Sequence, residues 1–290
     1  MMYFVKFDVM KNIILVISVC FILVSCAKKE KPYSFFVAGH LYGKPGTSDL
    51  GAYTNFKEKF DFIKSHNDLR FGVMTGDVVK EGKEAEWKAL VSDMNDLSVI
   101  SHLARGNHDY KNEENLTKYF PKKYYSFKEG ADLHIILDAN IDGWNITGEQ
   151  LLFLKNVLER EKELAKNIFL YSHQVIWFNL ADQPRYLRVN SEYGRHPKSN
   201  FYSEILPLFD DLDAEVYFFA GDVGAGSWAS DISYTKPSSQ IHLIASGMGD
   251  GVNDSFIMVT MNAYSHPEFS VISVDSTNKN QVQNLDHFLK

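Results

Sequence analysis

Residues 103–112 of the sequence, LARGNHDYKN, place an amide, an imidazole and a carboxylate side by side at the end of an apolar run. The run predicts a β-strand, and the three polar residues 107–109 follow it. A second stretch, TGDVV at residues 75–79, has the same form, with Asp77 after apolar residues. Polar groups at strand ends predict a site at the edge of a sheet, although Gly, Asn and Asp also favour simple turns.

Strands and helices alternate through most of the chain outward from this stretch. Apolar runs predict strands at residues 33–39, 70–77, 98–106, 133–140, 166–173 and 215–222. Helical spacing or composition predicts helices at residues 52–66 and 84–97, from about Thr147, and within 200–212. The last third predicts strands without helices, at residues 240–247, 255–262 and 268–275. This order predicts a sheet-centred, layered α/β fold.

Five polar residues fall at or just beyond the carboxyl ends of predicted strands: His40, Asp77, Asn107, His173 and Asp222. In open α/β sheets, ligands bind outside these ends, so the five side chains are expected to converge on one rim. Carboxylate, imidazole and amide groups together suit a divalent metal of borderline hardness.

These motifs resemble those of the calcineurin-like metallophosphoesterases. GNHD at residues 106–109 and TGDVV at residues 75–79 carry the resemblance, which extends over roughly residues 34–262. It implies a layered α/β/β/α sandwich, formed by a single domain at residues 33–290. It also implies hydrolysis of a phosphate-ester substrate with one or two divalent metal ions, Mn, Fe or Zn.

The resemblance assigns a role to each residue of these motifs. Asp77 would bridge two metals, and Asn107 and His173 would ligate the second of them. His108 would protonate the leaving oxygen, and Asp109 would orient His108 through a hydrogen bond. Asp109 is also compatible with a different role, in which its carboxylate only holds the loop.

Two motifs depart from the family pattern. Where the family has Asp-x-His after its first strand, this chain has Ala38, Gly39 and His40. Where the family has Gly-His-x-His, this chain has Gly221, Asp222, Val223 and Gly224. Asp222 therefore replaces a ligand histidine and can still donate oxygen, but it is also compatible with a loop-capping role. His40 would remain at the weakened first metal position, either as a ligand or as a structural residue.

A long polar segment follows His173, and its basic side chains include Arg185, Arg188, Arg195 and His196. Arginine pairs well with phosphate, so these residues are candidate substrate-binding groups. A solvated surface loop is the alternative interpretation.

The first residues predict export and a lipid anchor. Lys11, an apolar run over residues 13–24 and the sequence LVSC at residues 23–26 are typical of a bacterial lipoprotein signal peptide. Residues 1–25 would be removed, Cys26 would be lipidated, and residues 26–32 would form a tether. The predicted location is the extracytoplasmic face of the bacterial cell envelope. An uncleaved membrane anchor is the alternative.

The chain has 290 residues and a net charge of -7, so nucleic acid is not the expected partner. The principal hypothesis is a phosphoesterase anchored at the cell envelope. One alternative is a relative that lost catalysis and binds a phosphorylated or envelope ligand. A metal-dependent hydrolase of another ester is the third possibility.

Overall fold

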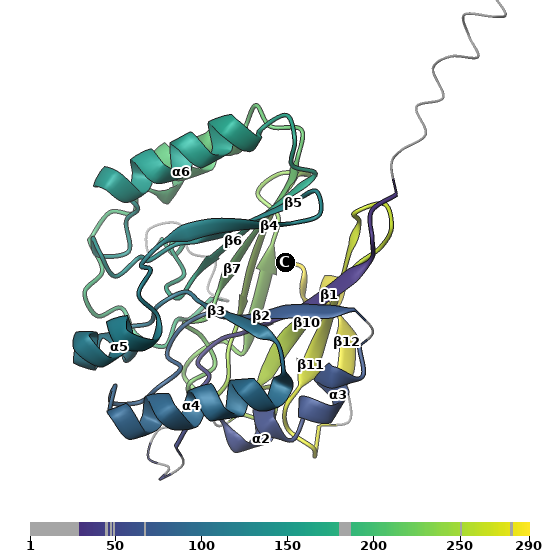
Figure 1. The fold of residues 1–290 in the computed structure, drawn as a ribbon. Helices are drawn as coiled ribbons and strands as arrows, with labels where there is room; N and C mark the ends of the chain where they lie inside the picture. The colour runs from purple at the N-terminus through teal and green to yellow at the C-terminus, as the bar shows by residue number, and fades with distance from the viewer. Residues whose placement is uncertain are drawn as a thin grey trace, which may run out of the picture.

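The computed structural model describes residues 29–43, 46, 48, 50–66, 68–179, 187–249, 251–278 and 281–290. Two six-stranded sheets pack face to face, and helices cover the outer face of each sheet (Figure 1). The predicted layered α/β/β/α sandwich is therefore confirmed. Cys26 and the predicted signal peptide lie outside the described residues. Within the described ranges, no helix is long and apolar enough to cross a membrane.

The first sheet combines the beginning and the end of the described chain. Its strands are, in spatial order, β12 (Val282–Asn284), β11 (Pro267–Ser273), β10 (Ser255–Met261), β1 (Tyr33–Ala38), β2 (Leu69–Met74) and β3 (Ile100–Leu103). β1, β2 and β3 are parallel, whereas β10 runs antiparallel to β1. The carboxyl ends of β1, β2 and β3 therefore meet at one edge, and the loops that follow them lie side by side.

The second sheet is built in the same manner. Its strands are, in spatial order, β4 (Tyr125–Glu129), β5 (Asp132–Ile136), β6 (Asn167–Ser172), β7 (Glu215–Ala220), β9 (Ile241–Ser246) and β8 (Ile232–Thr235). The four central strands are parallel, and the two edge strands β4 and β8 are antiparallel to their neighbours. The loops after β6 and β7 therefore also reach a common edge.

The helices fall on two sides of the sheet pair (Figure 1). Their bounds are α2 (Thr54–Lys57), α3 (Phe60–Lys64), α4 (Glu84–Leu97), α5 (Glu113–Tyr119) and α6 (Gly148–Glu161). The helix predicted over residues 52–66 is divided into α2 and α3. The predicted helix within residues 200–212 is one π turn followed by one 3₁₀ turn that contains Pro207.

Three apolar layers hold these elements together. The alternation of a strand is visible in β1, where Phe36 and Ala38 face the layer under α4, and Phe35 and Val37 face the other sheet. A row of stacked rings runs across neighbouring strands of the second sheet, on the face toward the first sheet, with His134 4.8 Å from Phe127 and 4.9 Å from Phe169 between centroids. Because so much ring surface is buried, the two sheets form a firm base for the loops at their edges.

Candidate metal centre and substrate pocket

Four of the predicted ligand residues meet where the two sheets' loops adjoin. His173 Nε2 lies 3.4 Å from Asp77 Oδ1 and 3.7 Å from Asp222 Oδ1. His40 Nε2 lies 3.7 Å from Asp77 Oδ2. Ligands that share one ion at bond lengths of about 2.0–2.2 Å stand roughly 3.0–3.5 Å apart, so these separations are close to those of a ligand set. All four side chains are buried.

Glycines allow these loops to approach one another closely. A Cβ on Gly76 would lie 2.5 Å from His173 Nδ1, and one on Gly106 would lie 2.2 Å from Asp77 Oδ1. Only glycine permits such approaches. Asp77 and His40 themselves have positive φ angles of 51° and 52°. Non-glycine residues hold this conformation at a cost, and such strain is typical of functional sites.

The unpaired atoms of these side chains suit a cation. The ring of His173 donates from Nδ1 to the carbonyl oxygen of Thr75 over 2.9 Å. A carbonyl can only accept, so Nδ1 carries a proton and Nε2 is the nitrogen that could offer a lone pair, as in metal-ligating histidines. Within the described residues, His173 Nε2 and Asp222 Oδ2 have no hydrogen-bond partner. Buried polar atoms are rarely left in this state without a ligand.

The charges of these side chains also suit a bound cation. Burial, and then the neighbouring Asp77 charge, raise the pKa of Asp222 well above its usual range. Burial lowers the pKa of His40 to about 4, which keeps its ring neutral at pH 7. In the described part of the chain, no lysine or arginine forms an ion pair with Asp77 or Asp222. A divalent cation would supply the missing positive charge.

The donor set is nevertheless open. Among the described residues, no group of three or more His, Cys, Asp or Glu side chains is placed so that it could hold a metal ion by itself. The residues present fit a divalent ion by donor type, burial and unpaired atoms, and their donors approach one another only in pairs. Any ion at this place would complete its coordination with other oxygen atoms.

Asp109 does not orient His108, and that prediction is wrong. The Asp109 carboxylate accepts four backbone N–H groups, those of Asp77 and Gly106 at Oδ2 and those of Val78 and Val79 at Oδ1. The alternative, in which Asp109 holds the loop, is what the structure shows. His108 is oriented by the Lys80 carbonyl, which accepts from Nδ1 over 2.8 Å.

We expect the Asp109→Asn variant to lose stability. The side-chain NH₂ group would face N–H donors and leave at least one of them unpaired in a buried place, at a cost of at least about 2 kcal/mol. Denaturant unfolding would measure this loss. If stability stays unchanged while catalysis falls only for esters with poor leaving groups, Asp109 acts through His108 after all.

Two of the positions that depart from the family pattern, Ala38 and Gly224, lie in tightly packed surroundings. Ala38 faces the apolar layer under α4. Gly224 has a φ of 80°, and a Cβ there would lie 2.5 Å from the Gly247 carbonyl oxygen. The loop after β7 thus packs directly on the loop after β9, backbone against backbone. A histidine at position 224 has no room, so the lost ligand cannot be restored by that single change.

Gly224→Ala is expected to destabilise the protein by about 2–4 kcal/mol, because it combines left-handed backbone strain with overpacking. Gly224→His should destabilise it at least as much and should not raise metal affinity. Thermal unfolding together with metal titration would check both variants. A stable Gly224→His protein that binds an additional ion would contradict this account.

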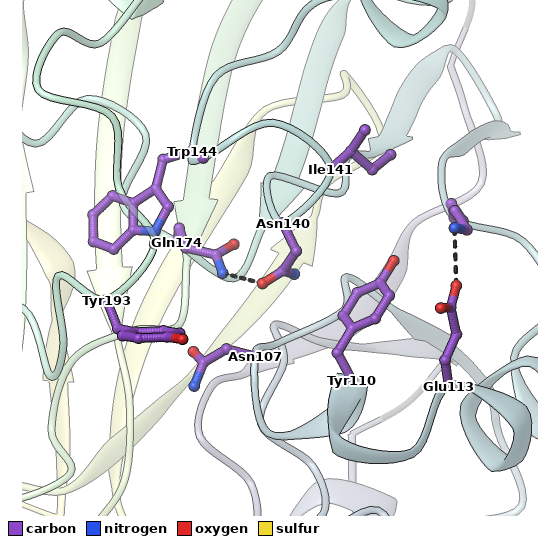
Figure 2. A pocket seen from close by; sticks show the side chains of 11 residues that line it. Asn107, Tyr110, Glu113, Asn140, Ile141, Trp144, Gln174 and Tyr193 are labelled. Atoms are coloured by element: carbon purple, nitrogen blue, oxygen red, sulfur yellow. Dashed lines mark hydrogen bonds and ion pairs between the residues drawn. The ribbon is translucent and has the colours of Figure 1, made fainter.

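A pocket of about 480 Å³ adjoins these loops (Figure 2). The amides of Asn107, Asn140 and Gln174 line it, together with the rings of Tyr110, Trp144 and Tyr193. Asn107 and Gln174 are the sequence neighbours of His108 and His173, so the pocket lies beside the loops that carry these residues. Gln174 was missed in the sequence, although its position beside His173 was the available signal.

Of the predicted substrate cations, the described residues Arg188, Arg195 and His196 do not belong to the lining of this pocket. Arg195 pairs with Glu192 at 3.2 Å, and His196 pairs with Asp142 at 2.9 Å. Arg185 lies outside the described residues. Their role in substrate binding stays a prediction. Lys123, which the sequence did not single out, lines the pocket and pairs with Glu113 at 3.0 Å.

Comparison with known proteins agrees with the geometry. The sequence model described as calcineurin-like phosphoesterase matches residues 46–223, more than half of the chain. The chain therefore belongs to the calcineurin-like phosphoesterase family. The match begins after Ala38 and ends before Gly224, and thus leaves out two of the positions that depart. No curated protein matches the chain significantly.

Solved structures share the fold at low identity. A dimetal phosphatase from Danio rerio has a TM-score of 0.61 and 12% identity, with 83% of this chain and 95% of that chain covered. GAP50, the anchor in the inner membrane complex of Plasmodium, has a TM-score of 0.60 and 15% identity, covering 88% and 89%. The yellow lupin purple acid phosphatase has a TM-score of 0.60 and 13% identity, covering 88% and 54%.

Proposed function

We propose that this chain hydrolyses phosphate esters with a single divalent metal ion. The convergence of Asp77, His173 and Asp222, with unpaired buried atoms on the last two, carries the proposal. His40, 3.7 Å from Asp77, and Asn107, which the family motif assigns to the metal, would complete the ligand set. One ion is proposed because Ala38 and Gly224 remove two donors of a paired site.

The ion and the side chains would contribute different parts of the chemistry. When bound, a divalent ion neutralises phosphoryl oxygens and lowers the pKa of water. His108, with Nδ1 donating to Lys80, keeps Nε2 available to pass a proton to the departing oxygen. Asp109 binds the backbone N–H groups of residues 77–79 and of Gly106. These bonds keep the positions of His108 and Asp77 fixed relative to each other.

The direct test uses the full-length chain, stripped of metal by a chelator and reloaded with Mn, Fe or Zn in turn. Hydrolysis of aryl phosphate monoesters and diesters should return with at least one metal and be absent from the stripped protein. No hydrolysis with any of the three metals would overturn the proposal.

A binding protein without catalysis is the second candidate function. The backbone contact at Gly224 and the apolar surroundings of Ala38 favour it, because they make the loss of two donors part of the fold. One fold relative, GAP50, is named as an anchor rather than as an enzyme. Tight binding of phosphate esters without turnover would favour this second function.

We further propose that Cys26 is lipidated and holds the protein on the extracytoplasmic side of the bacterial envelope. The sequence LVSC at residues 23–26 supports this proposal, and two or more acyl chains anchor stably. Cys26→Ser should release the protein from membranes and remove the acyl mass. Cys20→Ser is the matched control and should change neither. Unchanged membrane association of Cys26→Ser, with no acyl mass on the wild type, would contradict the proposal.

A further inference from the structure

A chain of amide groups leads into the pocket wall. Asn140 donates from its NH₂ group to the carbonyl oxygen of Arg105 over 2.8 Å and to Asp138 Oδ1 over 3.1 Å. Gln174 donates from its NH₂ group to Asn140 Oδ1 over 2.6 Å, as the dashed line in Figure 2 shows. Since the Arg105 carbonyl can only accept, the orientation of the Asn140 amide follows from it.

The orientation of Gln174 follows in turn. Asn140 Oδ1 can only accept, so Gln174 must turn its NH₂ group toward it, and Gln174 Oε1 is left as an acceptor. Gln174 is 2% exposed, and its Oε1 has no hydrogen-bond partner among the described residues. A buried acceptor without a donor is costly. A ligand that carries a hydrogen-bond donor would remove that cost.

The aromatic rings that line the pocket differ in their exposure and in their contacts with cations. Arg105 lies over the Tyr110 ring at 5.6 Å, and Arg195 lies over the Trp144 ring at 6.0 Å. Trp144 is 4% exposed, whereas Tyr193 is 87% exposed. Tyr193 therefore offers an exposed ring at this pocket. One ring face combined with amide groups suits a sugar, whose C–H face packs on one ring while its hydroxyls donate and accept.

We propose that this pocket binds the leaving group of the ester and that this group is polyhydroxylated, as in a sugar phosphate. The inference rests on the proposed hydrolase function, because the pocket adjoins the buried donors through Asn107 and Gln174. Gln174 and Tyr193 are then specificity-determining residues: Gln174 accepts from a hydroxyl group, and Tyr193 packs on the sugar ring.

The test compares kcat/KM for a hexose 6-phosphate and an aryl phosphate in the metal-loaded, full-length chain. The wild type should prefer the sugar ester. Gln174→Leu and Tyr193→Ala should each reduce the ratio of the two values about tenfold, since each removes one favourable contact. Tyr193→Phe keeps the ring and should keep the ratio. Gln283→Leu on β12 and Tyr264→Ala after β10 are the matched controls and should also keep it.

Several results would overturn the inference while leaving the hydrolase function intact. One is equal efficiency on both esters with no change in Tyr193→Ala. Another is a clear preference for a nucleoside monophosphate over the sugar ester, which would assign the pocket to a base. If neither ester is hydrolysed, the proposed hydrolase function is wrong. Calorimetric titration with hexose 6-phosphate then tests the sugar pocket separately. Weaker binding to Tyr193→Ala than to wild type supports the sugar pocket, and equal or absent binding overturns it.

Discussion

Asp77→Asn is expected to abolish metal binding and hydrolysis together. Asp77 lies within 3.4–3.7 Å of both His173 and His40. Burial raises the pKa of Asp77, but His173, His40 and His108, together with the backbone N–H of His108 that donates to Oδ1, lower it below its usual value, so the carboxylate is charged at neutral pH. Removing a ligand should exceed the 10–100-fold loss known for outer partners of a metal site, so we expect at least about 10²-fold weaker metal binding.

Asparagine is the appropriate replacement because Asp77 has a φ of 51°, a conformation that asparagine tolerates. The variant should therefore fold. Asp132→Asn is the matched control, because Asp132 is equally buried but bonds to Tyr33 and Asn167 between the sheets. That control should keep its metal. Full metal occupancy in Asp77→Asn would refute the assignment of Asp77 as the central ligand.

His108→Ala is expected to slow hydrolysis by about 10²–10⁴-fold for esters with poor leaving groups, the range typical of general acid catalysis. Activated aryl esters, whose leaving groups need little protonation, should be affected much less. Metal content should stay close to that of the wild type, because the His108 ring is held by the Lys80 carbonyl rather than by the buried donors. Rates across a series of leaving groups would measure this difference.

Asn107→Ala is the comparison that separates the two neighbours. If Asn107 serves the metal, its loss should lower metal affinity and impair all esters to a similar degree. Equal losses for good and poor leaving groups in His108→Ala would reject the acid role. His108 would then be a phosphate-binding or structural residue.

Much of the fold could be predicted because its central strands are continuous apolar runs. β6 and β7, for example, are buried along nearly their whole length and stand out in the sequence. The edge strands β4 and β12 were missed because they are only partly buried and contain polar residues. The sequence predicted a single helix in place of α2 and α3, because Phe56, Phe60 and Ile63 all face the same apolar layer at helical spacing.

The candidate site could be located from sequence, but its contacts could not. Periodicity reveals the strands, and Asp77, His173 and Asp222 were expected to converge because each follows the carboxyl end of one. Three of the four backbone donors on Asp109 come from the loop after β2, 30–32 residues earlier in the chain, and no local pattern encodes that contact between two loops. The orientation of Gln174 depends on Asn140, which is 34 residues away, and the exclusion of side chains at position 224 depends on Gly247.

The most direct test of the account is the number of metal ions per chain. Full-length protein would be equilibrated with Mn, Fe or Zn, dialysed and analysed for metal and protein together. We predict one ion per chain for at least one of these metals, since Asp77, His173 and Asp222 converge while Ala38 and Gly224 supply no donor. No bound ion with any of them, or two ions per chain, would contradict the single-metal centre.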